Sequence, residues 1–425
     1  MSSTASQFPE FGHALRKYFA FEPGFTPLNH GGFGATPRPV LDASNELTLQ
    51  LEANPDAFIW QRYEAKLNEV RRHLAQLISA DLDECVLVPN VCNGINTVLR
   101  NFEWRKEDVI IITNCTFSPI GNAARHISQT SSCPSVVEFT LSFPEPRADL
   151  LQRWRLFLRK LSSTSGTGAG RRKIVGIVDS IVSGPGLLMP WREMVQTCRE
   201  EGVWSIVDAA HSLGQEPVDL RTVQPDFWVS SCSKWLFARR GCAVLYVPKR
   251  NQHIIKSALP TQIHAPFSPD TSTFGSRFAW FGSLDVTIAL SIPAALQFRE
   301  LLGGEERINA YCHALAVAGG KRLQEILGTR QMDQTHGHIW TANMVAVQLP
   351  LGADIAPSFD IMHAFQVRLI ERHKIYASQW YHNGRWWIRA SAQVYNEISD
   401  FERLGYVVLD VCRGIEESRR VEVKL

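Results

Sequence analysis

Between residues 84 and 248, short runs of apolar residues alternate with stretches in which apolar residues recur at helical spacing. Each run is apolar along nearly its whole length, which is typical of a strand buried on both faces. Strands that alternate with helices predict an α/β fold with a parallel sheet covered on both sides. The runs expected to form strands are 84–90, 108–114, 135–141, 171–180, 203–212, 226–235 and 242–248.

Helices and loops are predicted outside these runs. Apolar residues recur at helical spacing over about 40–53 and 59–78, and Asn54-Pro55 separates the two stretches. The earlier segment PLNHGGFGATP, at 27–37, places three glycines between two prolines and therefore favours a loop. The small, polar and glycine-rich segment 161–172 is expected to form a surface loop.

The pattern changes after about residue 284, where helical spacing is interrupted by only two further apolar runs. This mixture predicts a smaller α+β domain at the C-terminus. Helices are expected over 286–328, 361–373 and 402–413, and strands over 342–350 and 386–391. The expected units are an N-terminal arm with a substrate loop at 1–39, a large α/β domain at 40–284 and a small domain at 285–425.

Composition narrows the class of protein. The chain has 425 residues, of which 45% are hydrophobic and 20% charged, as in an ordinary globular protein. Its 44 Lys and Arg balance 42 Asp and Glu, which argues against a dedicated nucleic-acid binder. The nine cysteines form no CxxC pair and are expected to be reduced thiols. No apolar stretch approaches the ~20 residues of a membrane span, so a cytoplasmic location is expected.

Polar residues stand where several predicted strands end. Ligands of open parallel sheets bind at the carboxyl ends of the strands, where Asp179, Asp208 and Lys234 are expected. Lys234 has apolar neighbours, which favours the neutral amine that a Schiff base requires. Alone, Lys234 could be a surface lysine and Asp208 a helix cap. Together they suit the aldehyde and the protonated ring nitrogen of pyridoxal 5'-phosphate.

A phosphate site is expected near the same edge of the sheet. Asn93, Gly94 and Ile95 open a predicted helix, whose free N–H groups attract an anion. The hydroxyls of Ser231 and Ser233 lie close to Lys234 in the sequence and can add hydrogen bonds. A simple turn with a helix cap is the alternative interpretation of Asn93-Gly94.

Seven segments of the sequence form a pattern that extends from about residue 25 to residue 412: LNHGGFGATP, NPDAF, VPNVCNGINTVLR, IVDAAHSLG, SCSKWLFARRG, FAWFGSLD and WIRASAQVYNEISDFERL. In these segments the chain resembles the class V aminotransferase family of fold type I pyridoxal-phosphate enzymes. Within that family, the sequence is similar to the isopenicillin N epimerase-like and hercynylcysteine sulfoxide lyase-like branch. The lysine segment together with DAAH is the most specific part of the resemblance.

The resemblance implies a large, mostly parallel sheet domain, a small C-terminal domain and three catalytic residues. Lys234 would bind the cofactor and move protons at Cα, Asp208 would pair with the ring nitrogen, and His211 would lie beside the ring oxygen or the lysine. Gly282 and Ser283 would reach the phosphate from a neighbouring subunit, which implies a homodimer with shared active sites. The other residues implied to bind the cofactor are Asn93, Gly94, Ile95, Phe117, Asp179, Ser183, Ser231 and Ser233.

Substrate binding is predicted from a smaller set of residues. Arg389, in WWIRAS, can bind a carboxylate with its guanidinium fork, and Asn29 and His30 are expected to close over a small amino-acid substrate. A metal site is not expected, because the pair His336 and His338 has no third ligand at suitable spacing. Pocket lining and packing are both open for the aromatic residues Trp280, Trp386, Trp387 and Tyr395.

The favoured reaction is elimination or replacement at the substrate side chain, with a C–S lyase as the leading case. An epimerase, a γ-substitution cyclase and a non-catalytic cofactor-binding protein are the alternatives. Residues 320–400 contain no cysteine, which disfavours a desulfurase with a mobile thiol. Phe117 stands where related lyases often have a tyrosine, and it can stack on the ring but cannot donate a proton.

Overall fold

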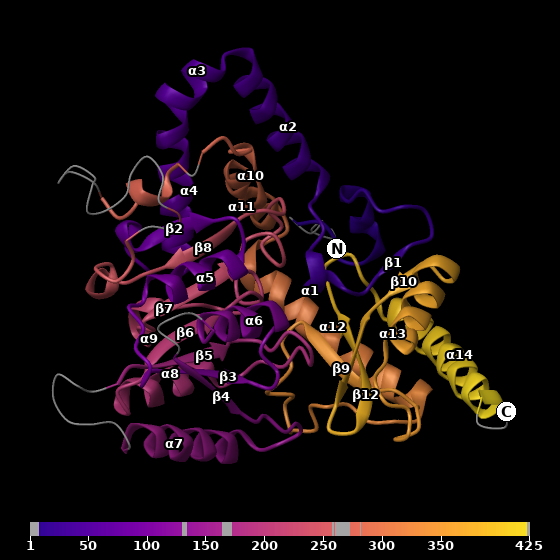
Figure 1. Ribbon diagram of the computed structural model, residues 1–425. Coiled ribbons are helices and arrows are strands. Elements are labelled where there is room, and N and C mark those ends of the chain that lie inside the picture. Colours follow the sequence, from indigo (N-terminus) through magenta and orange to yellow (C-terminus); the bar gives the residue numbers. More distant parts are fainter. Residues whose placement is uncertain are drawn as a thin grey trace, which may run out of the picture.

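The large sheet of the protein has seven strands in the order β2-β8-β7-β6-β5-β3-β4 (Figure 1). A computed structural model describes residues 8–129, 134–163, 172–256, 259, 273–280 and 282–422. All neighbouring strands are parallel except for β8, which is antiparallel to β2 and β7. The strands are β2 (Cys85–Val88), β3 (Val109–Thr113), β4 (Ser135–Phe139), β5 (Ile174–Asp179), β6 (Trp204–Asp208), β7 (Phe227–Ser231) and β8 (Ala243–Tyr246).

Each of the seven predicted strands is present, and helices cover both faces of the sheet. In β3, Val109 and Ile111 pack on one face, whereas Ile110 and Ile112 pack on the other, as the two-residue period of a strand requires. The helices on the first face are α4 (Tyr63–Leu77), α7 (Arg147–Ser163) and α8 (Trp191–Glu200). Those on the second face are α5 (Val91–Asn101) and α6 (Ser118–Ile127). The sheet therefore exposes the ends of its strands rather than its faces.

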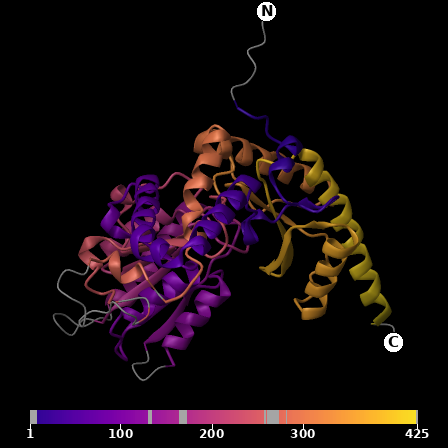
Figure 2. The same ribbon diagram turned by 90° about the horizontal axis from the view of Figure 1, so that it is seen from above.

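A second, three-stranded antiparallel sheet has the order β11-β12-β9. Figures 1 and 2 show it beside the large sheet, with α12 between the two and α14 along the outer side. The N-terminal strand β1 (Thr26–Pro27) runs parallel to β10 (Ile375–Tyr376) and joins this C-terminal region. Its elements are α12 (Gly304–Leu327), β9 (Met344–Gln348), α13 (Phe359–Gln366), β11 (Ser378–His382), β12 (Arg385–Ser391) and α14 (Ile398–Glu422).

The remaining helices are mostly short, and two of them pack on a long N-terminal helix. The helices α10 and α11 contact α2, and none of the described helices is long and apolar enough to cross a membrane. Most of the loop predicted at 161–172 lies outside the described residues. The α-helices of this group are α1 (His30–Phe33), α2 (Arg38–Ala53), α3 (Pro55–Ala57), α9 (Leu220–Val223), α10 (Thr287–Leu290) and α11 (Ile292–Leu301). Short 3-10 helices span His13–Tyr18, Leu82–Glu84, Lys249–Asn251 and Ser276–Phe278, and π-helical turns span Phe58–Arg62 and Val367–Arg372.

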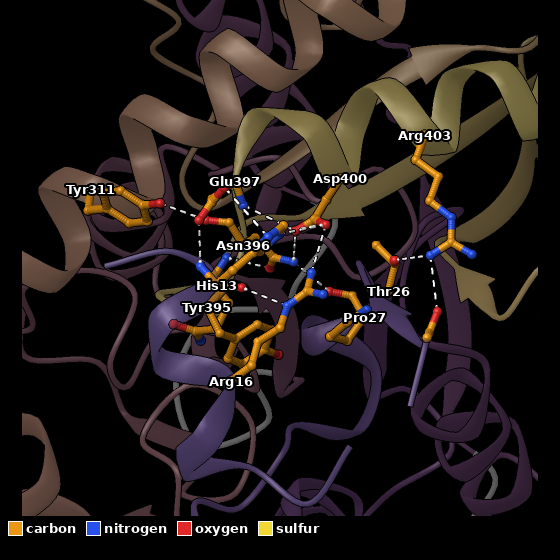
Figure 3. A network of polar contacts seen from close by, with 12 residues as sticks. His13, Arg16, Thr26, Pro27, Tyr311, Tyr395, Asn396, Glu397, Asp400 and Arg403 are labelled. Carbon is orange, nitrogen blue, oxygen red and sulfur yellow. Dashed lines mark hydrogen bonds and ion pairs between the residues drawn. The ribbon is translucent and has the colours of Figure 1, made fainter. Parts of the chain in front are cut away.

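A buried carboxylate attaches the N-terminal arm to the beginning of α14 (Figure 3). One oxygen of Asp400 accepts a hydrogen bond from Arg16 at 2.7 Å and lies 3.0 Å from Nε2 of His13. Its other oxygen accepts from the amide of Asn396 at 3.0 Å, and the same amide donates to the Pro27 carbonyl at 3.0 Å. Residues from the two ends of the chain therefore share one polar cluster.

The guanidinium of Arg299, on α11, connects the loop after β7 with Glu305 on α12. Its side chain is only 2% exposed and donates to the carbonyl oxygens of Trp235 at 2.7 Å and Gly214 at 3.1 Å. Glu305 accepts a further bond at 2.6 Å and balances the charge. The turn that follows residue 234 is thus held from the C-terminal side of the molecule.

Replacing Arg299 with alanine is expected to lower the free energy of unfolding by about 3 kcal/mol, because it leaves buried carbonyl groups and the Glu305 carboxylate unpaired. Arg322→Ala is the matched control, since Arg322 forms its ion pairs with Glu325 and Glu402 where both partners are partly exposed. That change is expected to cost less than about 1 kcal/mol. Urea denaturation measures both values, and equal losses would contradict the role assigned to Arg299.

Candidate active site

A cavity of about 280 Å³ lies at the carboxyl ends of β5, β6 and β7. It combines residues from the ends of three strands, the beginnings of two helices and the N-terminal glycine-rich segment. Asp179, Asp208, Ser231 and Lys234, all predicted from the sequence, meet there, as the rule for parallel sheets requires. The full lining is Gly32, Phe33, Asn90, Val91, Cys92, Phe117, Ile120, Asp179, Ile181, Ser183, Asp208, Ala210, His211, Ser231, Ser233, Lys234, Arg240 and Gly241.

The amine of Lys234 contacts a buried imidazole. Its Nζ atom lies 3.1 Å from Nε2 of His211, and the other ring nitrogen of His211 accepts a hydrogen bond from the indole of Trp235 at 3.2 Å. Burial lowers the pKa of Lys234 to about 8. The positive charge of Arg389 lowers this pKa as well, whereas the charge of Asp208 raises it. About half of Lys234 is therefore a nucleophilic, unprotonated amine at pH 8, and about a tenth of it at pH 7.

Two carboxyl groups stand side by side at the end of the sheet. Asp179 and Asp208 are register partners on β5 and β6, and each is 4% exposed. Burial raises the pKa of both groups, and the charge of Asp208 raises the pKa of Asp179 further. Asp208 accepts the backbone N–H of Ala210 at 3.0 Å, whereas Oδ2 of Asp179 has no partner among the described residues. Asp208 is thus the charged member of the pair and Asp179 the protonated one.

The N-terminus of α5 faces the cavity two residues earlier than predicted. Asn90 caps the helix by accepting the backbone N–H of Asn93 at 2.9 Å, so the helix begins at Val91. The cavity is lined by Asn90, Val91 and Cys92. The three predicted residues lie outside its lining: Asn93 is exposed beside its cap, Gly94 packs against Val229, and Ile95 is in the core.

The remaining predicted cofactor residues divide into two groups. Ser231 and Ser233 both line the cavity, with their hydroxyls 3.2 Å apart. Phe117, which caps α6 and is 43% exposed, and Ser183 line it as well. In contrast, Gly282 and Ser283 lie outside the cavity of their own chain, and their predicted contact with a neighbouring subunit stays a prediction.

The three predicted substrate residues lie behind the cavity wall. Arg389 is 3% exposed, and its two terminal nitrogens donate to the Ser183 carbonyl and to Oδ1 of Asn29, the latter at 2.8 Å. Its Nε atom is buried without a partner in the described part of the chain. In this arrangement an incoming carboxylate reaches Arg389 only after the Asn29 side chain has moved.

His30 supports the wall from behind rather than facing a substrate. Its Nε2 donates to the backbone carbonyl of Lys234 at 2.6 Å, and its Nδ1 accepts the hydroxyl of Tyr395 at 2.8 Å. The ring is 3% exposed. His30 was expected to close over the substrate. In the structure, both of its ring nitrogens instead form hydrogen bonds with protein groups.

Replacing His30 with glutamine is expected to flatten the pH dependence of stability. Burial lowers the pKa of His30 to about 3, so below about pH 6.5 the unfolded chain binds a proton that the folded chain excludes. Stability is complete above pH 6.5 and falls with pH, by about 2 kcal/mol at pH 5 from this residue. Urea denaturation between pH 8 and pH 5 measures the slope. The exposed His126→Gln serves as the control, and an unchanged slope in His30→Gln would contradict this account.

Three of the four aromatic residues considered for the pocket are packing residues. Trp386, Trp387 and Tyr395 are 1%, 2% and 1% exposed and belong to the hydrophobic cores. Trp280 lies edge-on to Tyr63, and both residues line a second cavity of about 80 Å³ that does not include Lys234. Their spacing in the sequence could not distinguish these alternatives, since a buried aromatic residue and a pocket-lining one follow the same apolar pattern.

Several lining residues were not predicted. Gly32 and Phe33 come from the glycine-rich segment, which was singled out for Asn29 and His30 instead. Arg240 is exposed, also lines the cavity and donates a hydrogen bond to the Gly34 carbonyl at 3.3 Å. Its position six residues after Lys234 was the available signal, because the short loop between β7 and β8 returns to the end of the sheet.

Sequence comparisons find relatives over most of the chain. The family model described as Aminotransferase class-V matches residues 31–404. The L-cysteine desulfhydrase-like protein lolT1 of Epichloe uncinata is 33% identical, over 95% of this chain and 96% of that protein. The hercynylcysteine sulfoxide lyase of Schizosaccharomyces pombe is 29% identical, over 95% of this chain and 98% of that protein.

Solved structures share the fold at low sequence identity. The cystine C–S lyase C-DES, in complex with cysteine persulfide, superposes with a TM-score of 0.73 and 18% identity. The match covers 91% of this chain and 98% of that chain. The fold type predicted from the sequence is therefore confirmed, together with its large, mostly parallel sheet.

Proposed function

Since the chain belongs to the class V aminotransferase family, we propose that it is a pyridoxal 5'-phosphate enzyme that cleaves a C–S bond of a cysteine-like amino acid. The observation that carries this proposal is the amine of Lys234, which lies inside a cavity beside His211 and a pair of buried carboxyl groups. The choice of bond is supported by relatives named L-cysteine desulfhydrase-like protein, L-cysteine desulfhydrase and hercynylcysteine sulfoxide lyase.

The residues around the cavity fit this cofactor. Lys234 supplies the amine for its aldehyde, and Asp208 supplies the negative charge for its ring nitrogen. Helix α5 points its first N–H groups at the cavity from Val91 and Cys92, which suits a phosphate, and the hydroxyls of Ser231 and Ser233 stand opposite in the lining. When bound, the cofactor withdraws electrons from the substrate Cα and makes its proton acidic.

The side chains of the chain perform the proton transfers and the positioning. Lys234, as a neutral amine, accepts the Cα proton and returns it later in the cycle. The sulfur substituent then leaves from Cβ with the electron pair of the C–S bond, so cysteine and water give pyruvate, ammonia and sulfide. Once the Asn29 side chain has moved away from Arg389, the guanidinium fork of Arg389 binds the α-carboxylate of the substrate, because the fork suits two carboxylate oxygens.

The sulfur is released to solvent rather than to a thiol of the enzyme. Among the described cysteines, only Cys92 lines the cavity, and burial raises its pKa, which opposes a reactive thiolate. Burial likewise raises the pKa of the Cys115 thiol to about 12. Residues 320–400 contain no cysteine, and the thiols of Cys312 and Cys412, the two cysteines of the small domain, are buried, so neither is an accessible persulfide acceptor.

Epimerisation and γ-substitution remain the second candidate. The isopenicillin N epimerase of Streptomyces clavuligerus is 25% identical over 79% of this chain, and the same removal of a Cα proton would begin either reaction. Phe117 favours neither outcome through proton donation, since its ring carries no acidic group. The alternative of a non-catalytic protein is disfavoured by the retained Lys234 and Asp208.

A panel of amino acids distinguishes these reactions. The purified protein is loaded with pyridoxal 5'-phosphate and incubated with cysteine, cystine, cysteine S-conjugates and their sulfoxides. Pyruvate, ammonia and the sulfur product in equal amounts would support the C–S lyase. Inversion at Cα without pyruvate would instead support the epimerase, and a protein that neither binds the cofactor nor turns over any substrate would overturn the enzyme.

We also propose that the enzyme is a cytoplasmic homodimer in which Gly282 and Ser283 contribute to the partner's phosphate site. Both residues lie away from the cavity of their own chain, at a partly exposed turn, which leaves them accessible to a second copy. Light scattering measures the mass in solution. A monomer with full cofactor affinity would overturn the shared site.

A further inference from the structure

Trp235 directly follows the lysine, yet it contacts His211 instead of the cavity. Its ring is 1% exposed, and Nε1 donates to Nδ1 of His211 at 3.2 Å. An indole N–H can only donate a hydrogen bond and has no lone pair to accept one. Nδ1 of His211 therefore carries no proton in this arrangement.

This contact decides where the ring proton of His211 resides. A neutral imidazole has a single proton, which must then be on Nε2. Burial, together with the charges of Lys234 and Arg389, holds the pKa of His211 well below its usual range, so the doubly protonated ring is excluded as well. The hydrogen on Nε2 points to Nζ of Lys234, which lies 3.1 Å away.

The same geometry specifies the protonation state of the lysine. An ammonium group has three donors and no acceptor, so it cannot accept the Nε2–H of His211. Only the neutral amine, with its lone pair directed at the ring, completes the contact. The chain Trp235–His211–Lys234 is consistent in one protonation pattern, in which each N–H is followed by a nitrogen lone pair.

We propose that Trp235 is a positioning residue that fixes the tautomer of His211 and thereby favours the unprotonated form of Lys234. The proposal deepens the proposed function, on which it rests, because a neutral amine is what bonds to the cofactor aldehyde and accepts the Cα proton. Once Lys234 has gained a proton, the Nε2–H of His211 opposes it. The pattern therefore also favours return of that proton to the substrate.

Other charged groups act on Lys234 and remain when Trp235 is changed. Asp208 on β6 and Cys92 on α5 raise its pKa, whereas Arg389 on β12 lowers it. In Trp235→Phe, His211 is free to place its proton on Nδ1 and to accept a hydrogen bond from the Lys234 ammonium at Nε2. The pKa of Lys234 is then expected to rise by about 1, a tenfold change in its ionisation constant.

Nitrogen NMR of the full-length, cofactor-free protein tests the tautomer directly. The histidines are labelled with ¹⁵N, and the His211 signals are assigned by their loss in His211→Gln. In the wild type at pH 9, where most of Lys234 is unprotonated, Nδ1 is expected to be unprotonated and Nε2 protonated. In Trp235→Phe, protonation of Nδ1 is expected to appear. A wild-type His211 with its proton on Nδ1, or an unchanged tautomer in Trp235→Phe, would overturn the proposal.

Trp228→Phe is the matched control for the loss of a buried indole. Trp228 is 0% exposed on β7, and its Nε1 has no hydrogen-bond partner within the described ranges. This variant loses similar volume but no contact with His211, so its His211 signals and its lysine should match the wild type. If it instead reproduced the changes of Trp235→Phe, general packing would be responsible and the proposal would be wrong.

The amine itself is measured by its reaction with acetic anhydride, which acylates only unprotonated amines. Mass spectrometry of the peptide that contains Lys234 gives the rate as a function of pH. Half-maximal labelling is expected near pH 8 in the wild type and in Trp228→Phe, and about 1 higher in Trp235→Phe. Since neither readout uses the cofactor, a protein that passes both but does not bind it refutes the proposed function alone. A failed tautomer test in an active enzyme refutes this inference alone.

Discussion

Lys234→Ala is expected to lower turnover at least about 10³-fold and to abolish covalent attachment of pyridoxal 5'-phosphate. Lys234 is the only lysine among the described residues that line the cavity, so no neighbouring side chain can supply the amine. Reduction with borohydride, followed by digestion and mass spectrometry, should place the cofactor on the Lys234 peptide of the wild type and leave the variant unlabelled. Methylamine added to the variant should restore part of the turnover, because it supplies a primary amine.

Lys249→Ala is the control for a lysine removed elsewhere. Lys249 is exposed and forms an ion pair with Asp81, and neither residue lines the cavity. Its removal should therefore leave activity unchanged. Thermal unfolding shows whether Lys234→Ala remains folded. A folded Lys234→Ala protein with normal turnover would remove Lys234 from the mechanism, and labelling of a different lysine by borohydride would do the same.

The second large effect separates two adjacent carboxyl groups. Asp208→Asn is expected to lower turnover by about 10²–10³-fold, because it removes the negative charge that stabilises the protonated ring nitrogen. Asp179→Asn is expected to change turnover within about threefold, or less than about 1 kcal/mol. The reason for the difference is that burial and the charge of Asp208 already keep Asp179 protonated, and an amide resembles a neutral carboxyl group.

The two substitutions control for each other, since they alter neighbouring register positions by the same chemistry. Turnover and the visible spectrum of the bound cofactor measure the outcome. If Asp179→Asn were the more damaging variant, the charge would reside on β5 and the assignment of the pair would be reversed. Equal losses would indicate that the two groups share the proton without preference.

The sequence predicted the sheet well because six of its seven strands are almost wholly buried, and only the edge strand β4 is partly exposed. Such strands are apolar along their length, and each of the seven was located, as was the meeting of Asp179, Asp208 and Lys234 at one edge. Helix α7 was missed. Only one side of this helix is buried, through Leu150, Trp154 and Leu158, and its other residues are largely polar and include several arginines. Strand β11 was missed because its sequence, Ser-Gln-Trp-Tyr-His, shows neither an apolar run nor a polar–apolar alternation, and it is only partly buried.

Local competition between hydrogen bonds explains why some predicted site residues lie outside the cavity lining. Asn90 and Asn93 are both suitable caps, and only the folded backbone shows that the side chain of Asn90 accepts the N–H of Asn93. His30 looked available for a substrate, but Lys234 and Tyr395, 204 and 365 residues away, occupy its two nitrogens. Pairings over such distances leave no mark in the local spacing of residues.

The attachment of the N-terminal arm to α14 has a consequence for biosynthesis. Asp400 bonds to a residue 384 positions earlier, and Tyr395 holds the imidazole that supports the backbone of Lys234. During translation, the strands of the large sheet leave the ribosome well before these two residues do. The sheet can begin to form while the chain is still being made, since domains fold from the N-terminus onward. The lysine, however, acquires its full support only after Tyr395 has been made, and a nascent or truncated chain that stops before residue 395 lacks both contacts.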